Sequence, residues 1–152
     1  LHDIGYAISR RRHHKHGRYL IQEADWNGFT SEEVGIMANV VRYHRRAFPK
    51  KKHAPYGALS KSARHTVKKL GAILRLAEGL DRSHYQNVER MEVTVNPAAV
   101  RLVLHTRGDP EIDVWGGRRA GALFEDVFER RIEVRAAWMR RAAPSDRAPS
   151  AA

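Results

Sequence analysis

The stretch FTSEEVGIMANVVRYH, residues 29–44 of the 152-residue sequence, carries the clearest helix signal and sets the fold class. Thr30 and Glu33 have the spacing of a capping box, in which each side chain bonds the backbone N–H of the other residue at a helix start. Apolar residues then recur at steps of three and four, which is the rhythm of one helix face: Val34, Met37, Val40 and Val41. His44 continues that stripe. We therefore expect a helix over residues 30–44 with His44 on its buried side.

Two further helices are predicted on either side of this one. A short helix over about residues 13–25 is ended by DWNGFT. A longer one covers HTVKKLGAILRLAEGLDRSH, residues 65–84, whose apolar face comprises Val67, Leu70, Ile73, Leu74, Ala77 and Leu80. On its surface, Glu78 and Arg82 have the i, i+4 spacing of a pair. Between the helices, prolines, a glycine and several lysines predict a basic loop over residues 45–60.

The period of the apolar residues changes from 3.6 to 2 after residue 88, which is typical of strands. Short alternating runs near residues 91–95, 100–104 and 112–114 are separated by turn residues, and they predict a three-stranded antiparallel meander. One amphipathic helix follows, and then a fourth short strand around residues 132–134.

The predicted fold is therefore mainly α, followed by a small α+β appendage that contains the antiparallel meander. We divide the chain into a helical domain, residues 1–88, and a small α+β domain, residues 89–137. The last residues, 138–152, are rich in Ala, Pro, Ser and Arg. Such a composition buries too little apolar surface to offset the entropy of ordering, so we expect a disordered tail.

The charge of the chain points to an anionic partner. Lys and Arg number 28 against 17 Asp and Glu, a formal net charge of +11, which attracts phosphate-bearing molecules. There is no cysteine, which fits a reducing compartment, and no apolar run approaches the roughly 20 residues of a transmembrane helix. The chain begins at Leu1 without a signal peptide, so we interpret it as a cytoplasmic piece of a longer protein that does not enter a membrane.

Several catalytic motifs are missing from the sequence. It has no glycine-rich phosphate loop followed by Lys-Ser/Thr and no Gly-x-Ser-x-Gly turn, so neither a P-loop nor a serine nucleophile is supported. Zinc-finger spacing, aromatic RNA-binding strands and a basic zipper are absent too.

A metal site is the remaining candidate for chemistry. Metal-dependent hydrolysis of phosphate esters or anhydrides needs carboxylate and imidazole ligands that converge from several helices. The helical half offers His2, Asp3, His13, His14, His16, His44 and Glu78. Spacing alone leaves other interpretations open: a solvated His-rich loop, a His44 bonded to a backbone carbonyl, and a Glu78 in a surface salt bridge.

Five short stretches of the sequence resemble a known protein family. They are LHDIG (1–5), HHKHGRYLI (13–21), VRYHRR (41–46), LGAILRLAEGLDRSH (70–84) and LFEDVFERRIEV (123–134). In this order and spacing they resemble the C-terminal region of the exopolyphosphatase / guanosine pentaphosphate phosphatase (Ppx/GppA) family. The resemblance covers nearly all of the chain except the tail.

The resemblance implies a helical domain of the HD superfamily and a small α/β appendage. In metal-binding HD domains, His2 and Asp3 would match the central His-Asp pair, His16 and His44 resemble intervening histidines, and Glu78 falls where a final Asp stands. Two departures from that pattern are the Glu in place of Asp and a first His that lies outside this sequence. The resemblance also implies that Mg²⁺-dependent cleavage belongs to N-terminal actin-like domains absent here, so this chain resembles the part that holds the substrate.

Three hypotheses follow. In the first, the chain binds polyphosphate or a similar polyanion and supports a homodimer of the full-length enzyme. The residues expected to contact the anion are Arg10, Arg11, Arg12, Arg45, Arg46, Lys50, Lys51 and Lys52. The second is a metal-dependent HD-type nucleotide phosphohydrolase with a divalent metal on the His-Asp-Glu set. The third is a non-catalytic nucleic-acid-binding module.

Overall fold

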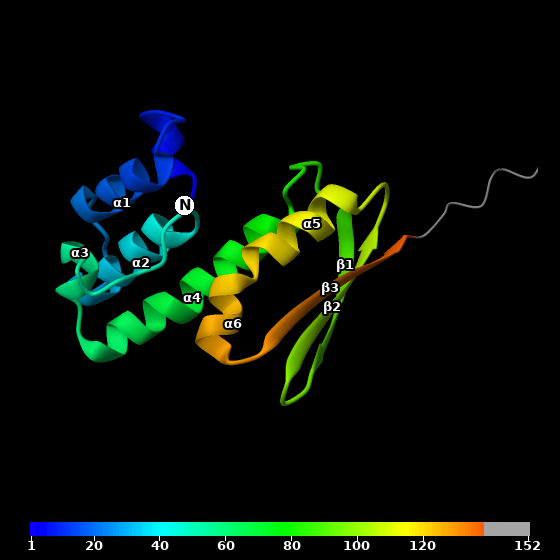
Figure 1. Cartoon of the computed structure of the whole chain (residues 1–152). Helices are drawn as coiled ribbons and strands as arrows, with labels where there is room; N and C mark the ends of the chain where they lie inside the picture. Colours follow the sequence, from blue (N-terminus) through cyan, green and yellow to red (C-terminus); the bar gives the residue numbers. More distant parts are fainter. Residues whose placement is uncertain (139–152) are drawn as a thin grey trace, which may run out of the picture.

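A long helix, α4 (Lys61–Leu80), runs through the centre of the molecule between a group of shorter helices and a small sheet (Figure 1). The computed structural model describes residues 1–138. The elements before α4 are a 3₁₀ turn, η1 (Ile4–Ala7), and the helices α1 (His13–Glu23), α2 (Ser31–Tyr43) and α3 (Ala54–Gly57). Those after it are β1 (Val88–Val95), β2 (Ala99–Thr106), α5 (Glu111–Ala120), α6 (Ala122–Phe128) and β3 (Arg131–Trp138).

The capping box predicted for α2 is present. Thr30 N donates to Glu33 Oε2 at 2.8 Å, and Glu33 N donates back to the Thr30 hydroxyl at 3.3 Å. The helix ends at Tyr43, so His44 is its C-cap. The helix expected near residues 13–25 is also confirmed, as α1.

Helix α4 starts and ends about four residues earlier than predicted. Ser60 caps its start by accepting a hydrogen bond from Ala63 N at 3.1 Å. After Leu80 the chain turns, because buried Asp113 accepts bonds from the backbone N (2.8 Å) and the hydroxyl (3.1 Å) of Ser83. The apolar face was predicted in part wrongly, since Leu70 and Ile73 are 45% and 49% exposed.

The antiparallel meander is wrong, because the sheet is mixed. Strands lie in the order β1-β2-β3, with β1 antiparallel and β3 parallel to β2. Residues 112–114, predicted as the third strand, lie inside α5, whose first turn follows Pro110 and carries two acidic residues. Proline and acidic side chains favour a helix start. Helices α5 and α6 form the crossover that a parallel pair requires, and the overall α+β class holds.

Helix α4 takes part in the cores of both halves. Its Val67 packs with Tyr43 and Tyr56 among the helices, whereas Leu76 and Leu80 pack against the sheet. The sheet side of that core consists of Val100, Leu102, Leu104, Ile132 and Val134. The domain boundary after residue 88 stays a prediction. Of the predicted tail, residues 139–152 lie outside the described residues.

Strand β1 is an edge strand whose apolar side chains are exposed. Met91, Val93 and Val95 pair with core residues of β2 and therefore face the same side of the sheet, yet they are 45–62% exposed. Within residues 1–138, no helix combines the length and the apolar character needed to cross a bilayer.

Candidate metal and anion site

Four segments bring histidines and carboxylates together at one end of the helical half. Asp3 precedes η1, His13 opens α1, His44 caps α2, and Glu78 lies in the last turn of α4. Gly5 makes this possible, because a Cβ at that position would lie 2.0 Å from the His13 carbonyl oxygen. Only glycine lets η1 approach α1 so closely, and that approach places Asp3 beside His13.

One group of ligand atoms consists of Asp3 Oδ1, His13 Nε2 and His44 Nε2. His13 Nε2 lies 3.2 Å from Asp3 Oδ1 and 3.3 Å from His44 Nε2. Each histidine contacts a backbone carbonyl through Nδ1: Val41 O at 2.7 Å for His44 and Arg10 O at 3.3 Å for His13. A carbonyl only accepts, so both Nδ1 atoms carry a proton, and in the neutral form of each ring Nε2 then presents a lone pair.

A second group shares the same aspartate. His2 Nε2 lies 3.3 Å from Asp3 Oδ2 and 3.2 Å from Glu78 Oε2. The Asp3 carboxylate thus turns one oxygen to His13 and the other to His2. The two groups, Asp3-His13-His44 and His2-Asp3-Glu78, each have the mutual spacing of metal ligands.

The first group fits a divalent metal. Asp3 Oδ1 is buried and has no hydrogen bond, although His13 Nε2 is close. Two imidazole nitrogens and a carboxylate oxygen that converge at this spacing can bind one metal ion, and histidines held through Nδ1 by carbonyls are typical of metal ligands. Burial lowers the pKa of His44, so its imidazole stays neutral as ligation requires. The only cationic group near His13 Nε2 in the described structure is Arg45 Nη1, at 3.5 Å. A mixed imidazole and carboxylate set suits transition metals such as Mn²⁺ or Zn²⁺ better than Mg²⁺.

Two histidines of α1 lie outside these groups. His14 is 2% exposed, and burial first, then the charge of Arg42, lowers its pKa to about 3. His16, predicted as a ligand, lies instead in a shallow hollow with Ser9, Arg11 and Arg12.

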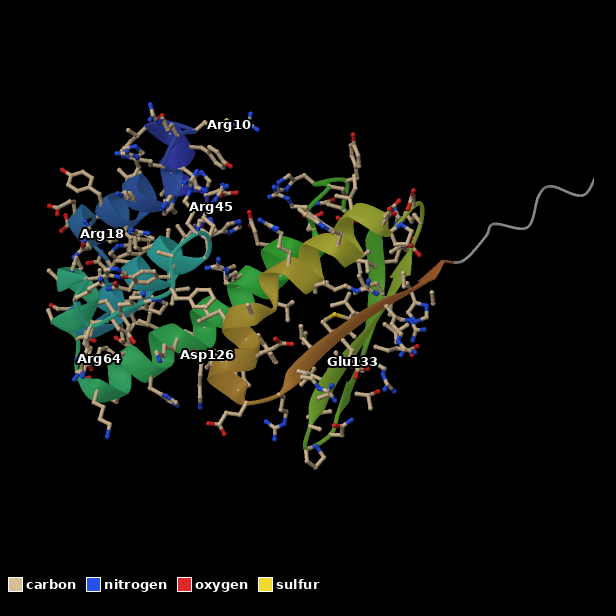
Figure 2. The ribbon with its side chains drawn as sticks, viewed as in Figure 1. Arg10, Arg18, Arg45, Arg64, Asp126 and Glu133 are labelled. Atoms are coloured by element: carbon tan, nitrogen blue, oxygen red, sulfur yellow. The ribbon has the colours of Figure 1, made fainter. Side chains whose placement is uncertain are left out.

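A cleft rich in arginine adjoins the two ligand groups, which together we call the cluster. Two adjoining hollows of about 610 and 660 Å³ share Arg45, Glu78, Arg82 and Trp115 in their walls. We call this surface the arginine cleft, and its arginines are Arg10, Arg45, Arg46, Arg75, Arg82 and Arg119. Figure 2 shows Arg10 and Arg45 on the side of the helices that faces α5. Because Glu78 belongs to both the cleft and the cluster, an anion in the cleft lies next to the candidate metal ligands.

The charges of the cleft are largely uncompensated. Only Glu78 and Glu111 add negative charge to its walls, and none of its six arginines forms an ion pair within residues 1–138. Arg75 donates through Nη2 to Arg46 O at 2.7 Å, but its buried Nη1 has no acceptor. Burial also lowers the pKa of this guanidinium. An unpaired buried donor is costly, and an anion in the cleft would supply its acceptor.

Close helix packing builds the far wall of the cleft. A Cβ on Gly79 of α4 would lie 2.6 Å from the Gly116 carbonyl oxygen of α5, and one on Gly116 would lie 2.3 Å from Gly79 O. These glycines therefore let α5 lie directly on α4. The contact places Trp115, which is 53% exposed, and Arg119, whose guanidinium lies 5.4 Å from the Trp115 ring centre, in the cleft wall.

The structure brings together most, but not all, of the residues predicted for the site. His2, Asp3, His44 and Glu78 meet, joined by His13. Arg10, Arg45 and Arg46 line the cleft, whereas Arg11 and Arg12 lie in the hollow of His16. Lys50, Lys51 and Lys52 are all exposed, and Lys51 lines a separate hollow with Lys61, Arg64, His65 and Lys68. Glu78 contacts His2 and forms no ion pair with Arg82.

The sequence did not lead us to expect Arg75, Arg82 and Arg119 among the residues around the anion. Arg75 and Arg82 flank Glu78 at i−3 and i+4, so all three share one helix face, and this spacing was a usable signal. Arg119 was out of reach, because the first turn of its helix, at residues 112–114, was predicted as a strand.

Comparisons with known proteins show the family of the chain. Residues 1–109 match the family model described as Ppx/GppA phosphatase, domain III. A guanosine-5'-triphosphate,3'-diphosphate pyrophosphatase of Vibrio vulnificus (strain YJ016) is 30% identical over 106 residues, which cover 68% of this chain and 20% of that protein. The protein of the same name from Pseudoalteromonas translucida (strain TAC 125) is 31% identical over 68 residues, 45% of this chain and 14% of that protein. The chain thus aligns with no more than a fifth of the length of these relatives.

Proposed function

The chain belongs to the Ppx/GppA phosphatase family, and from that premise we propose that it forms the part of such an enzyme that binds the phosphate chain of the substrate. The observation that carries the proposal is the arginine cleft. Guanidinium groups bind phosphate oxygens in pairs with strong charge-assisted hydrogen bonds. Six of them around one cleft offer successive contacts to a run of phosphates such as polyphosphate, or the phosphates of guanosine pentaphosphate.

In this proposal the phosphoanhydride is cleaved elsewhere in the full-length enzyme, by actin-like domains that hold Mg²⁺. The role of the cleft is to hold the phosphate chain of the substrate while the terminal phosphate is removed. Tyr6 and Trp115, which are 43% and 53% exposed in the cleft wall, also offer aromatic faces on which a guanine can stack. The lack of cysteine supports a cytoplasmic enzyme.

Tripolyphosphate binding to the purified chain tests the cleft. The double variant Arg45→Ala/Arg82→Ala removes two cleft arginines, and Arg131→Ala/Arg135→Ala removes the same charge from exposed positions of β3. In calorimetric titrations at low salt, we expect the cleft variant to bind at least about tenfold more weakly, since each charge-assisted bond is worth roughly 1.5–3 kcal/mol. Equal losses in both variants would show that net charge alone attracts the anion. Duplex DNA that binds as tightly as tripolyphosphate at matched salt would favour the nucleic-acid module instead.

A second candidate function is metal-dependent phosphohydrolysis at the cluster itself. The observation that favours it is Asp3, whose two oxygens face two ligand groups. Two members of these groups, His44 and Glu78, also line the arginine cleft. A bound divalent metal would polarise a phosphoryl oxygen and lower the pKa of water. Asp3, His13 and His44 would hold it, with His2 and Glu78 beside the second oxygen of Asp3. The cleft arginines would orient the phosphate.

Metal content after chelator-free purification separates the two functions. Stoichiometric Mn²⁺ or Zn²⁺ that is lost in Asp3→Asn, together with metal-stimulated phosphate release, would establish the second function. A metal-free protein that still binds tripolyphosphate leaves the first. Asp126→Asn, on α6 and outside the cluster, serves as the control.

We also propose that the full-length enzyme is a homodimer and that the exposed apolar face of β1 contributes to its interface. Contiguous apolar side chains on an edge strand need a cover, and Met91, Val93 and Val95 supply them. Val93→Lys is expected to lower the mass seen by sedimentation equilibrium of the full-length enzyme, and an unchanged mass would remove β1 from the interface.

A further inference from the structure

A second pocket lies among the helices α1 and α2, away from the arginine cleft. Its volume is about 230 Å³, and its walls include Lys15 and Arg18 of α1, Asn39 and Arg42 of α2, and His53. We call it the Asn39 pocket. It shares no wall residue with the cleft. Lys15 and Arg18 lie on the side of α1 opposite His13 at 100° per residue, and Figure 2 shows Arg18 across the bundle from Arg10 and Arg45.

Two buried polar groups in this pocket lack partners. Arg42 Nη1 is buried without an acceptor, and Asn39 Oδ1 is buried without a donor. Asn39 is 2% exposed, and its Nδ2 donates to Gly35 O at 2.9 Å, which fixes which amide atom is the oxygen. A free guanidinium nitrogen and a free amide oxygen in one small pocket call for a ligand that both accepts and donates hydrogen bonds.

The charge of the pocket adds to this demand. Lys15, Arg18 and Arg42 form no ion pair with any carboxylate in the described part of the chain. Arg18 instead donates to Gln22 Oε1 at 2.8 Å. Burial lowers the pKa of Arg42, and the charge of Arg18 acts in the same direction. Three cations held together without a counter-charge favour an anion between them.

Two contacts of His53, in the pocket wall, determine which of its ring nitrogens is the acceptor. Its Nδ1 accepts from the backbone N of Lys50 at 3.4 Å and contacts the Tyr43 hydroxyl at 2.8 Å. Since a backbone N–H only donates, Nδ1 is the acceptor and the proton of the neutral ring is on Nε2.

We propose that the Asn39 pocket is a second anion site, separate from the cleft, that binds a single phosphate group in its hydrogen-bearing form. The unprotonated phosphate oxygens accept from Arg42, Arg18 and Lys15, and the P–OH donates to Asn39 Oδ1. Sulfate has the same shape but no proton to donate near neutral pH, so the pocket selects phosphate over sulfate. The site does not depend on the function of the cleft.

Titration of the ¹⁵N-labelled chain with inorganic phosphate tests the proposal. The side-chain signals of Asn39 and Arg42 are followed by NMR at pH 6.5 and constant ionic strength, and the titration is repeated with sulfate. Lys15→Ala/Arg18→Ala removes two cations from the pocket. Lys69→Ala/Arg135→Ala removes the same charge from exposed positions outside every hollow described above.

We expect phosphate to shift both signals in a saturable manner, with about tenfold weaker binding in Lys15→Ala/Arg18→Ala and unchanged binding in Lys69→Ala/Arg135→Ala. Arg45→Ala/Arg82→Ala should leave this site intact even where it abolishes tripolyphosphate binding in the cleft, so the two proposals fail separately. Shifts that fail to saturate, or equal loss in both charge variants, would overturn the site. Equal affinities for phosphate and sulfate would overturn the hydrogen bond to Asn39.

Discussion

Acidification from pH 7 to pH 5 is expected to destabilise the protein through His14. This imidazole is 2% exposed, and its pKa is lowered from 6.5 to about 3, mainly by burial and then by the charge of Arg42. In the unfolded chain the same histidine has a pKa near 6.5. Between the two values a proton binds the unfolded chain but not the folded one. The free energy of unfolding therefore falls as the pH drops below about 6.5 and stops falling near 3.

The magnitude follows from this linkage. Each pH unit below the unfolded pKa costs about 1.4 kcal/mol for one group. At pH 5, about one and a half units below 6.5, the loss relative to pH 7 is about 2 kcal/mol. Burial lowers the pKa of His44 too, so that residue acts with the same sign.

Urea unfolding followed by far-UV circular dichroism at pH 7, 6 and 5, in a buffer with chelator, measures the effect. His14→Gln removes the titrating ring and should lose about 2 kcal/mol less than the parent over this range. His65→Gln, at an exposed position of α4, should keep the full pH dependence. Equal pH dependence in His14→Gln and the parent, or an NMR titration of the folded His14 ring near pH 6.5, would refute the argument.

Substitutions at four positions test the contacts described above by thermal and urea unfolding. Gly5→Ala places a methyl group against the His13 carbonyl and should cost about 1–3 kcal/mol, whereas Gly71→Ala, with nothing within 4 Å, should stabilise α4 by up to about 1 kcal/mol; equal effects would contradict the close approach of η1. Asp113→Ala leaves Ser83 N–H without its acceptor and should cost about 1–3 kcal/mol of stability, and Asp113→Asn should cost less. If Asp113→Ala leaves the stability unchanged, the turn after α4 does not need this bond. Thr30→Ala removes the capping box of α2 and should cost about 1 kcal/mol, and no change would mean that tertiary contacts alone fix the helix start.

The helices were predictable where local signals determine them. The capping box of Thr30 and the periodicity of α2 depend on residues within one or two turns, and α2 forms almost as expected. The strand at residues 112–114 failed because the alternation of Ile112 and Val114 spans only three residues. The helix start signalled by Pro110 and Glu111 outweighed this short alternation. Asp113, the polar residue of the alternation, is buried and bonds Ser83, 30 residues away in sequence.

The sequence indicated which residue types form the candidate site, but not which of the histidines lie in it. His13 and His16 are one helical turn apart, so sequence spacing does not choose between them. The choice depends on the contact of Gly5 with the His13 carbonyl, which turns Asp3 towards His13. Such a contact between η1 and α1 is tertiary. For the same reason a second group of unpaired cations around Asn39 did not emerge from the sequence.

The position of Glu78 depends on both halves of the molecule. It lies on α4 between Val67, which packs among the helices, and Leu80, which packs against the sheet. The next residue of α4, Gly79, contacts Gly116 and so fixes the position of α5. Trp115 and Arg119 of α5 then form one wall of the cleft. In the part of the chain that the structure describes, the small α+β half contributes no ligand to the His-Asp-Glu cluster. It nevertheless holds the end of α4 from which Glu78 reaches His2, so the geometry of the cluster and the shape of the cleft depend on the packing of the sheet.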